Sequence, residues 1–293
     1  MTTDRRDPGF AMRLSKYEAT ANDFLISDGR TDGLDANAAS VVAQRVCDRH
    51  RGIGADGLIR LLSSTTPEAD CVMELHNADG SRAEMSGNGV RTLALAARRV
   101  GLGTNLKLRV QTDAGLKSID FADPVSPEDA VSGSEVFSTV EMGSPTFDAD
   151  RIPFTGDSPL SIDVDGSTYR GIAVGMGNPH LVVFVDDPAQ IDLDSVGARL
   201  EIDPRFPRKT NVEFVRVTDH GLQLRVWERG ASETLSCGTG ACASVAAARS
   251  IGLIGDSADV EVSGGTLNVR LDQAAYLTGP ARWIADITTR VDL

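Results

Sequence analysis

Residues 84–99 read EMSGNGVRTLALAARR, and residues 233–250 read ETLSCGTGACASVAAARS. In both stretches a Gly-x-Gly sequence leads into a helical run rich in small and apolar residues. The residue before the first glycine is Ser86 in one copy and Cys237 in the other. The chain therefore contains one kind of helix start twice, once behind a hydroxyl and once behind a thiol.

Aligning Ser86 with Cys237 sets an offset of 151 residues, and similarity at this offset extends well beyond the helices. A period above a hundred residues indicates a duplicated domain rather than a solenoid. Each half is predicted to consist of short alternating strands around one helix. The segments matched at this offset are apparent strands at 71–75 and 222–227 and hairpins at 108–121 and 260–271. A fainter match, at a slightly different offset, pairs residues 22–28 with 178–184.

The chain is long enough for two domains. We expect a loose extension over residues 1–11, an N-terminal domain over 12–130 and a C-terminal domain over 131–281, with 282–293 as a candidate final strand of the first domain. Residues 124–135, PVSPEDAVSGSE, are rich in proline, serine and acids and are predicted to be a linker.

The composition disfavours several classes of function. The formal net charge of −13 makes nucleic acid or an anionic membrane an unexpected partner. No apolar run is long enough to span a bilayer, and residues 1–12 lack the apolar core of a signal peptide. The four cysteines fit neither a zinc site nor a disulfide framework, so we expect reduced thiols, a cytoplasmic location and no metal.

A Gly-x-Gly helix start favours binding of a small anion. The free N–H groups of the first turn and the positive end of the helix dipole both attract negative charge. The glycines leave room for close approach. A nucleotide is disfavoured, because neither stretch contains GxGxxG or a following lysine.

Ser86 and Cys237 are candidate proton carriers. A helix start lowers the pKa of a thiol, so Cys237 could act as base or nucleophile; a buried, capping cysteine is the structural alternative. Ser86 alone is best explained as an ordinary N-cap. Together, however, two proton carriers on opposite sides of one carbon could invert a stereocentre.

These motifs, taken together, resemble the diaminopimelate epimerase family from about Met12 to the C-terminus. The resemblance implies two similar α/β (α+β) domains, each a β-barrel-like sheet around a central helix, with the active site in the interdomain cleft. It also implies an isomerase of lysine and peptidoglycan biosynthesis that uses no cofactor and forms a homodimer. The motifs are ANDF (21–24), GIGADG (52–57), NADGS (77–81), SGNGVR (86–91), GMGNPH (175–180), TNVEF (210–214) and ERGASETLSCGTGACA (228–243).

The same resemblance assigns roles to individual residues. The two catalytic cysteines of the family correspond to Ser86 and Cys237. Glu228 and Arg229 correspond to the pair that holds the distal end of the substrate; without the motif they would be read as a solvated surface pair. His180 is a site-lining, supporting or core residue. The substrate-binding asparagines are Asn22, Asn77, Asn178 and Asn211, and the cradle for the α-carboxylate is Gly87, Asn88, Gly238 and Thr239.

Ser86 departs from the family pattern, which has cysteine at this position. A hydroxyl is far less acidic than a thiol, whose ordinary pKa is ~8.5. Three explanations remain open: a natural working serine, as in similar proline racemases and hydroxyproline epimerases; an engineered replacement; or drift to another role. The alternative functions are accordingly racemisation of another amino acid and inactive binding of an amino acid.

Ser86 also leads to a redox prediction. Two facing cysteines could form a disulfide, whereas serine and Cys237 cannot. We therefore expect any activity to survive mild oxidation by this route, as measured by turnover before and after treatment with an oxidant. Loss of activity reversed by dithiothreitol, with Cys237 linked to another cysteine of the chain, would contradict this.

Overall fold

The computed structural model describes residues 10–292, which form two compact units. The first unit comprises the described residues up to Ser138 and those from Pro280 onward, and the second comprises Thr139–Gly279. Most of the expected extension, residues 1–9, lies outside the described residues. Phe10 and Ala11 already belong to the first strand, so regular structure begins earlier than predicted.

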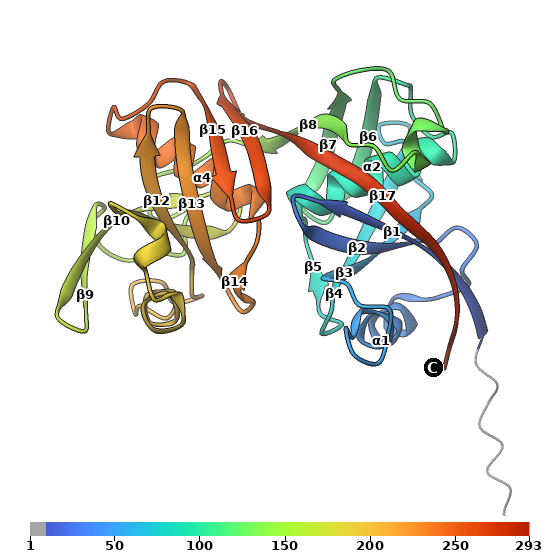
Figure 1. Cartoon of the computed structure of the whole chain (residues 1–293), viewed down its shortest axis with the longest axis horizontal. Coiled ribbons are helices and arrows are strands. Elements are labelled where there is room, and N and C mark those ends of the chain that lie inside the picture. The colour runs from blue at the N-terminus through green and yellow to red at the C-terminus, as the bar shows by residue number, and fades with distance from the viewer. Residues whose placement is uncertain (1–9, 293) are drawn as a thin grey trace, which may run out of the picture. The chain divides into compact units, whose positions relative to one another are not determined.

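The first unit wraps strands around helix α2 (Gly87–Arg99), as Figure 1 shows. The strand order is β7–β6–β4–β3–β2–β1–β17, with parallel pairs at β2–β3 and β4–β6. Strand β5 pairs with β4 as an antiparallel hairpin. The bounds are β1 Phe10–Ala19, β2 Asn22–Asp28, β3 Gly57–Leu62, β4 Cys71–Asn77, β5 Arg82–Ala83, β6 Lys107–Thr112, β7 Gly115–Phe121, and β17 Ala275–Val291, which enters this unit at Pro280.

The second unit repeats this plan around helix α4 (Gly238–Ser250). Its strand order is β9–β10–β11–β12–β13–β15–β16–β17, with parallel pairs at β11–β12 and β13–β15 and with β14 on β13. Strand β8 pairs with β17. The bounds are β8 Val136–Gly143, β9 Leu160–Val164, β10 Ser167–Gly175, β11 Pro179–Phe184, β12 Asn211–Thr218, β13 Gly221–Glu228, β14 Ser232–Thr234, β15 Ser257–Val262 and β16 Gly265–Leu271.

The structure confirms the internal repeat. Helices α2 and α4 both have 13 residues and keep the offset of the sequence alignment. The matched strands and hairpins are also present at the predicted places. Both helices are buried on nearly every side because strands surround them, which explains their small and apolar residues.

Short helices complete each unit. In the first, α1 (Ala36–Cys47) is capped by Asp35 and buries Val42 and Val46. The second contains η2 (Pro188–Gln190), η3 (Leu193–Gly197) and α3 (Ala198–Glu201). Within residues 10–292, no helix is both long and apolar enough to cross a membrane.

The predicted linker is instead packed against the first unit. Val125 and Ala130 are buried, and the Arg98 guanidinium of α2 donates hydrogen bonds of 3.1 and 3.2 Å to the Val125 carbonyl. Residues Asp129–Val131 form the short helix η1. The polar composition suggested a linker, but two apolar residues anchor the segment, and the first of the unit's two stretches of chain ends at Ser138.

The central helix should be the main source of stability in the first unit. Leu93 of α2 is fully buried, so Leu93→Ala should lower the free energy of unfolding by about 2–5 kcal/mol through lost burial and a cavity. Urea unfolding followed by circular dichroism measures this. Leu116→Ala on the exposed part of β7 should change it by less than about 0.5 kcal/mol. Equal losses of unfolding free energy for the two variants would contradict the assignment of α2 as the main source of stability in this unit.

Candidate active site

Ser86 and Cys237 cap the two central helices in the same way. The Gly89 N–H donates to Ser86 Oγ at 3.0 Å, and the Gly240 N–H donates to Cys237 Sγ at 3.4 Å. Both capping residues have an extended backbone. The hydroxyl and the thiol therefore lie at the first turns, beside N–H groups for which a helix supplies no acceptor of its own.

The second glycine of each helix start packs closely against side chains inside the unit. A Cβ on Gly89 would lie 3.2 Å from Ile59 Cδ1, and a Cβ on Gly240 would lie 2.7 Å from Glu213 Oε1. We expected these glycines to make room for a ligand. At this position they make room for side chains of the surrounding strands.

The first helix start contains a buried cation that the sequence analysis did not assign. The Arg91 side chain is fully buried and donates to Asn88 Oδ1 at 2.8 Å and to the Gly87 carbonyl at 3.2 Å. Asn88 in turn donates to Asn22 Oδ1 at 3.3 Å. Arg91 therefore fixes the Asn88 amide and adds positive charge behind the first turn. In the sequence, an arginine within the otherwise apolar part of the predicted helix could have indicated this buried cation.

Asn22 and Asn77 lie near each other at strand ends. Asn22 donates to the Asp56 carboxylate, and the Asp56 carbonyl accepts from the Ala78 N–H at 3.1 Å. The Asn77 side chain is exposed and donates to Ser81 Oγ at 3.0 Å. Asp56, which was not predicted, thus connects the two predicted asparagines.

In the second unit, Asn211 connects the segments that contain the predicted binding residues. Its Nδ2 donates to the Pro179 carbonyl at 2.9 Å, and its Oδ1 accepts from the Arg229 N–H at 2.9 Å. The Arg229 side chain is exposed, whereas Glu228 is half-buried and accepts from the Thr234 hydroxyl. Asn211 therefore orders the turn after β13.

His180 links Asn178 to a buried carboxylate. Its Nε2 lies 2.9 Å from Asn178 Oδ1, and its Nδ1 lies 2.7 Å from Glu213 Oε1. Both His180 and Glu213 are fully buried, whereas Asn178 is half-buried. Of the roles left open for His180, the supporting role fits these contacts. Glu213 was missed, although a glutamate between Val212 and Phe214 in an apolar strand was a usable signal.

The predicted lowering of the Cys237 pKa is wrong for this structure. Burial raises the pKa of this thiol well above its ordinary value, and the charges of Glu228 and Glu213 raise it further. Hydrogen bonds from Thr239 and from the Gly240 N–H act in the opposite direction but are outweighed. Cys237 is therefore a protonated thiol here, suited to donating a proton. The other three cysteines, Cys47, Cys71 and Cys242, are also buried.

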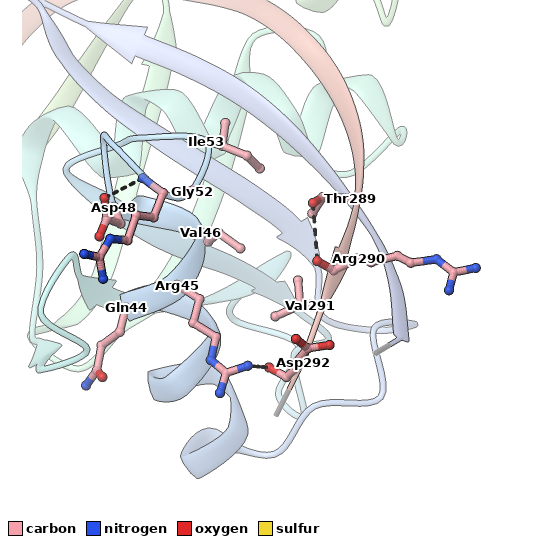
Figure 2. A pocket seen from close by; sticks show the side chains of 11 residues that line it. Gln44, Arg45, Val46, Asp48, Gly52, Ile53, Thr289, Arg290, Val291 and Asp292 are labelled. Atoms are coloured by element: carbon pink, nitrogen blue, oxygen red, sulfur yellow. Dashed lines mark hydrogen bonds between the residues drawn. The ribbon is translucent and has the colours of Figure 1, made fainter. Parts of the chain in front are cut away.

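A pocket elsewhere in the first unit contains none of the predicted site residues. It lies between the end of α1 and the end of β17, where Arg45 donates to the Asp292 carbonyl (Figure 2). The predicted residues gather instead at the starts of α2 and α4. Ser86, Gly87, Asn88, Asn22 and Asn77 belong to the first unit, and Cys237, Gly238, Thr239, Asn178, His180, Asn211, Glu228 and Arg229 belong to the second.

Comparison with known proteins identifies similar chains. Residues 14–147 and 172–284 match the family model described as diaminopimelate epimerase. A diaminopimelate epimerase from Moorella thermoacetica is 39% identical over 279 residues, which cover 92% of this chain and 96% of that protein. One from Thermosynechococcus vestitus is 42% identical over 291 residues, with the same coverage.

Solved structures share the fold at much lower identity. A hydroxyproline epimerase from Agrobacterium vitis aligns with a TM-score of 0.71 and 15% identity, covering 96% of this chain and 92% of that one. A PhzF-family phenazine biosynthesis protein from Bacillus anthracis aligns with a TM-score of 0.69 and 17% identity, covering 96% and 100%.

The raised pKa of Cys237 leads to a testable pH dependence. Folding favours the protonated thiol, so this contribution to stability is present below the ordinary thiol pKa of ~8.5 and is lost as pH rises beyond it. We expect alkylation of Cys237 by iodoacetamide to show an apparent pKa above ~8.5 in the folded chain, and Glu228→Gln to lower it. The measurement uses a chain in which the other three cysteines are alanine. An apparent pKa below that of the urea-unfolded chain would refute the prediction.

Proposed function

We propose that this chain, which belongs to the diaminopimelate epimerase family, interconverts LL- and meso-2,6-diaminopimelate. As an isomerase without a cofactor, it would remove the α-proton and return one on the opposite face of the carbon. The observation that carries the proposal is the duplicated helix start within a chain of this family. Each copy is capped by a group that can carry a proton.

The two helix starts supply the binding site for the α-carboxylate in this proposal. The N–H groups of Gly87, Asn88, Gly238 and Thr239 occupy the first turns, where backbone donors and the helix dipole favour an anion. The α-proton of an amino acid is very weakly acidic. Fixed donors that stabilise the negative charge formed on deprotonation are therefore needed.

The distal amino-acid head of the substrate would be held by charged and amide groups. The exposed Arg229 guanidinium can form a bidentate pair with a carboxylate. The Glu228 carboxylate can accept hydrogen bonds from an ammonium group, and Asn22, Asn77, Asn178 and Asn211 can supply further polar contacts. Retention of both charges favours a substrate with a second zwitterionic head.

Ser86 and Cys237 are proposed as the two proton carriers, but they are not equivalent. The Cys237 thiol is the more acidic of the two groups, since a hydroxyl is far less acidic than a thiol, although burial raises the Cys237 pKa in the structure without a ligand. When the thiolate takes the α-proton and Ser86 donates, the serine is left as an alkoxide that must recover a proton before the next turnover. We therefore expect inversion to be slower than exchange of the α-hydrogen on the face of Cys237.

The proposed cellular setting follows from this activity. The reaction belongs to lysine and peptidoglycan biosynthesis, and the free buried cysteines are compatible with the cytoplasm. We also propose a homodimer as the assembled form.

Incubation with LL-diaminopimelate in D2O tests the function. For the chain as written we expect slow formation of meso product with faster incorporation of deuterium, because Ser86 is the weaker partner. Ser86→Cys should raise the rate of inversion, and Cys237→Ala should abolish both inversion and exchange while circular dichroism shows an intact fold.

Other outcomes decide between the alternatives. Binding without exchange, even in Ser86→Cys, would indicate an inactive binding homologue. Absence of binding together with inversion of another amino acid would indicate a different racemase. Full activity of Cys237→Ala would overturn the proposed mechanism.

A further inference from the structure

Glu213 of β12 is a buried carboxylate with incomplete hydrogen bonding. Its side chain is fully buried, and its Oε1 lies 2.7 Å from His180 Nδ1. Within the described part of the chain, Glu213 Oε2 has no hydrogen-bond partner. Burying such an oxygen lowers stability, so the fold itself gives no reason to keep it there.

The duplicated fold supplies an internal comparison for Glu213. In the first unit Phe24 of β2 pairs with Gly57 of β3, and in the second His180 of β11 pairs with Asn211 of β12. Two residues after Gly57, strand β3 carries Ile59, and two residues after Asn211, strand β12 carries Glu213. Both side chains lie against the second glycine of the adjacent helix start. A hydrocarbon therefore fills this place in one unit and a carboxylate in the other.

The contacts of His180 define how the carboxylate acts on Asn178. The amide oxygen of Asn178 lies 2.9 Å from His180 Nε2 and can only accept, so this contact is a hydrogen bond in the tautomer that has a proton on Nε2. A second proton must lie between His180 Nδ1 and Glu213 Oε1. With its oxygen held in this way, Asn178 has its NH2 group left for other contacts, and that group has no hydrogen bond to any residue in 10–292.

We propose that Glu213 is a positioning residue for the reaction inferred above, because it fixes the orientation of the Asn178 amide through His180. This inference rests on the proposed function. Asn178 then presents two N–H donors to the substrate, and a carboxylate or carbonyl oxygen of the substrate is the group they fit. We call the contacts from Glu213 through His180 to Asn178 the relay. The first unit has no counterpart of this relay, since the Ile59 side chain can neither donate nor accept a hydrogen bond.

Two substitutions separate the relay from simple packing. Glu213→Ile reproduces the residue of the first unit and removes the contact to His180. Glu213→Gln retains the shape, and its amide can donate to His180 Nδ1, so Nε2 keeps its proton. Asp203→Asn serves as a matched control, because Asp203 is also a buried carboxylate of the second unit but pairs with Arg205.

The binding measurement uses LL-diaminopimelate and isothermal calorimetry, with KM and kcat measured in the Ser86→Cys background. We expect Glu213→Ile to raise Kd and KM by about tenfold or more, the usual loss for a misplaced hydrogen bond, with a smaller change in kcat. Glu213→Gln and Asp203→Asn should remain within about threefold of the parent chain. Unchanged binding by Glu213→Ile, or equal loss in Glu213→Ile and Glu213→Gln, would overturn the relay.

A spectroscopic measurement on the unmodified chain tests the relay even when a variant does not fold. The ¹⁵N resonances of His180 in the unmodified chain should show a protonated Nε2 at neutral pH, with no ligand present. An unprotonated Nε2 would overturn the proposal. If the unmodified chain fails to bind diaminopimelate while Nε2 is protonated, the proposed function fails and the relay geometry stands apart from it.

Discussion

A helix surrounded by strands cannot leave its first turn unsatisfied, and this constraint organises both units. The early N–H groups of α2 and α4 have no acceptors within their own helices. One of them is satisfied by the side chain of the preceding residue, Ser86 or Cys237. The remainder favour a negatively charged ligand. The residue that caps the helix therefore lies beside these donors, so under the proposed function one position would serve both stability and chemistry.

Duplication gave the two units the same backbone but different electrostatics. Arg91 places a buried cation at the start of α2, whereas Cys242 occupies the corresponding position of α4. Conversely, a buried carboxylate lies beside the start of α4, where the first unit has Ile59. The two starts are thus opposite in local charge. Burial and, after it, the charges of Glu228 and Glu213 raise the pKa of Cys237, although a helix start alone would favour the thiolate.

Local patterns were sufficient to predict the repeated elements, since helix starts, hairpins and apolar strands depend on nearby residues. The helices α2 and α4 and the matched hairpins were predicted from such local patterns. What could not be predicted depends on three-dimensional surroundings. The pKa of Cys237 reflects burial and two carboxylates from other strands. The packing of Val125 and Ala130 depends on a helix earlier in the chain, and the contact between Glu213 and His180 joins two strands separated by the segment that contains η2, η3 and α3.

The path of β17 has a consequence for the order of folding. Residues up to Gly279 of this strand belong to the second unit, and those from Pro280 belong to the first, where Arg282–Val291 pair with β1. The first unit is therefore discontinuous in sequence, with Thr139–Gly279 inserted before its last strand. During synthesis the second unit has all its residues before the first has its own last strand. Strand β1 can pair with β17 only after the end of the chain has been made, so this pairing has the largest sequence separation in the first unit, and such contacts generally favour slow folding.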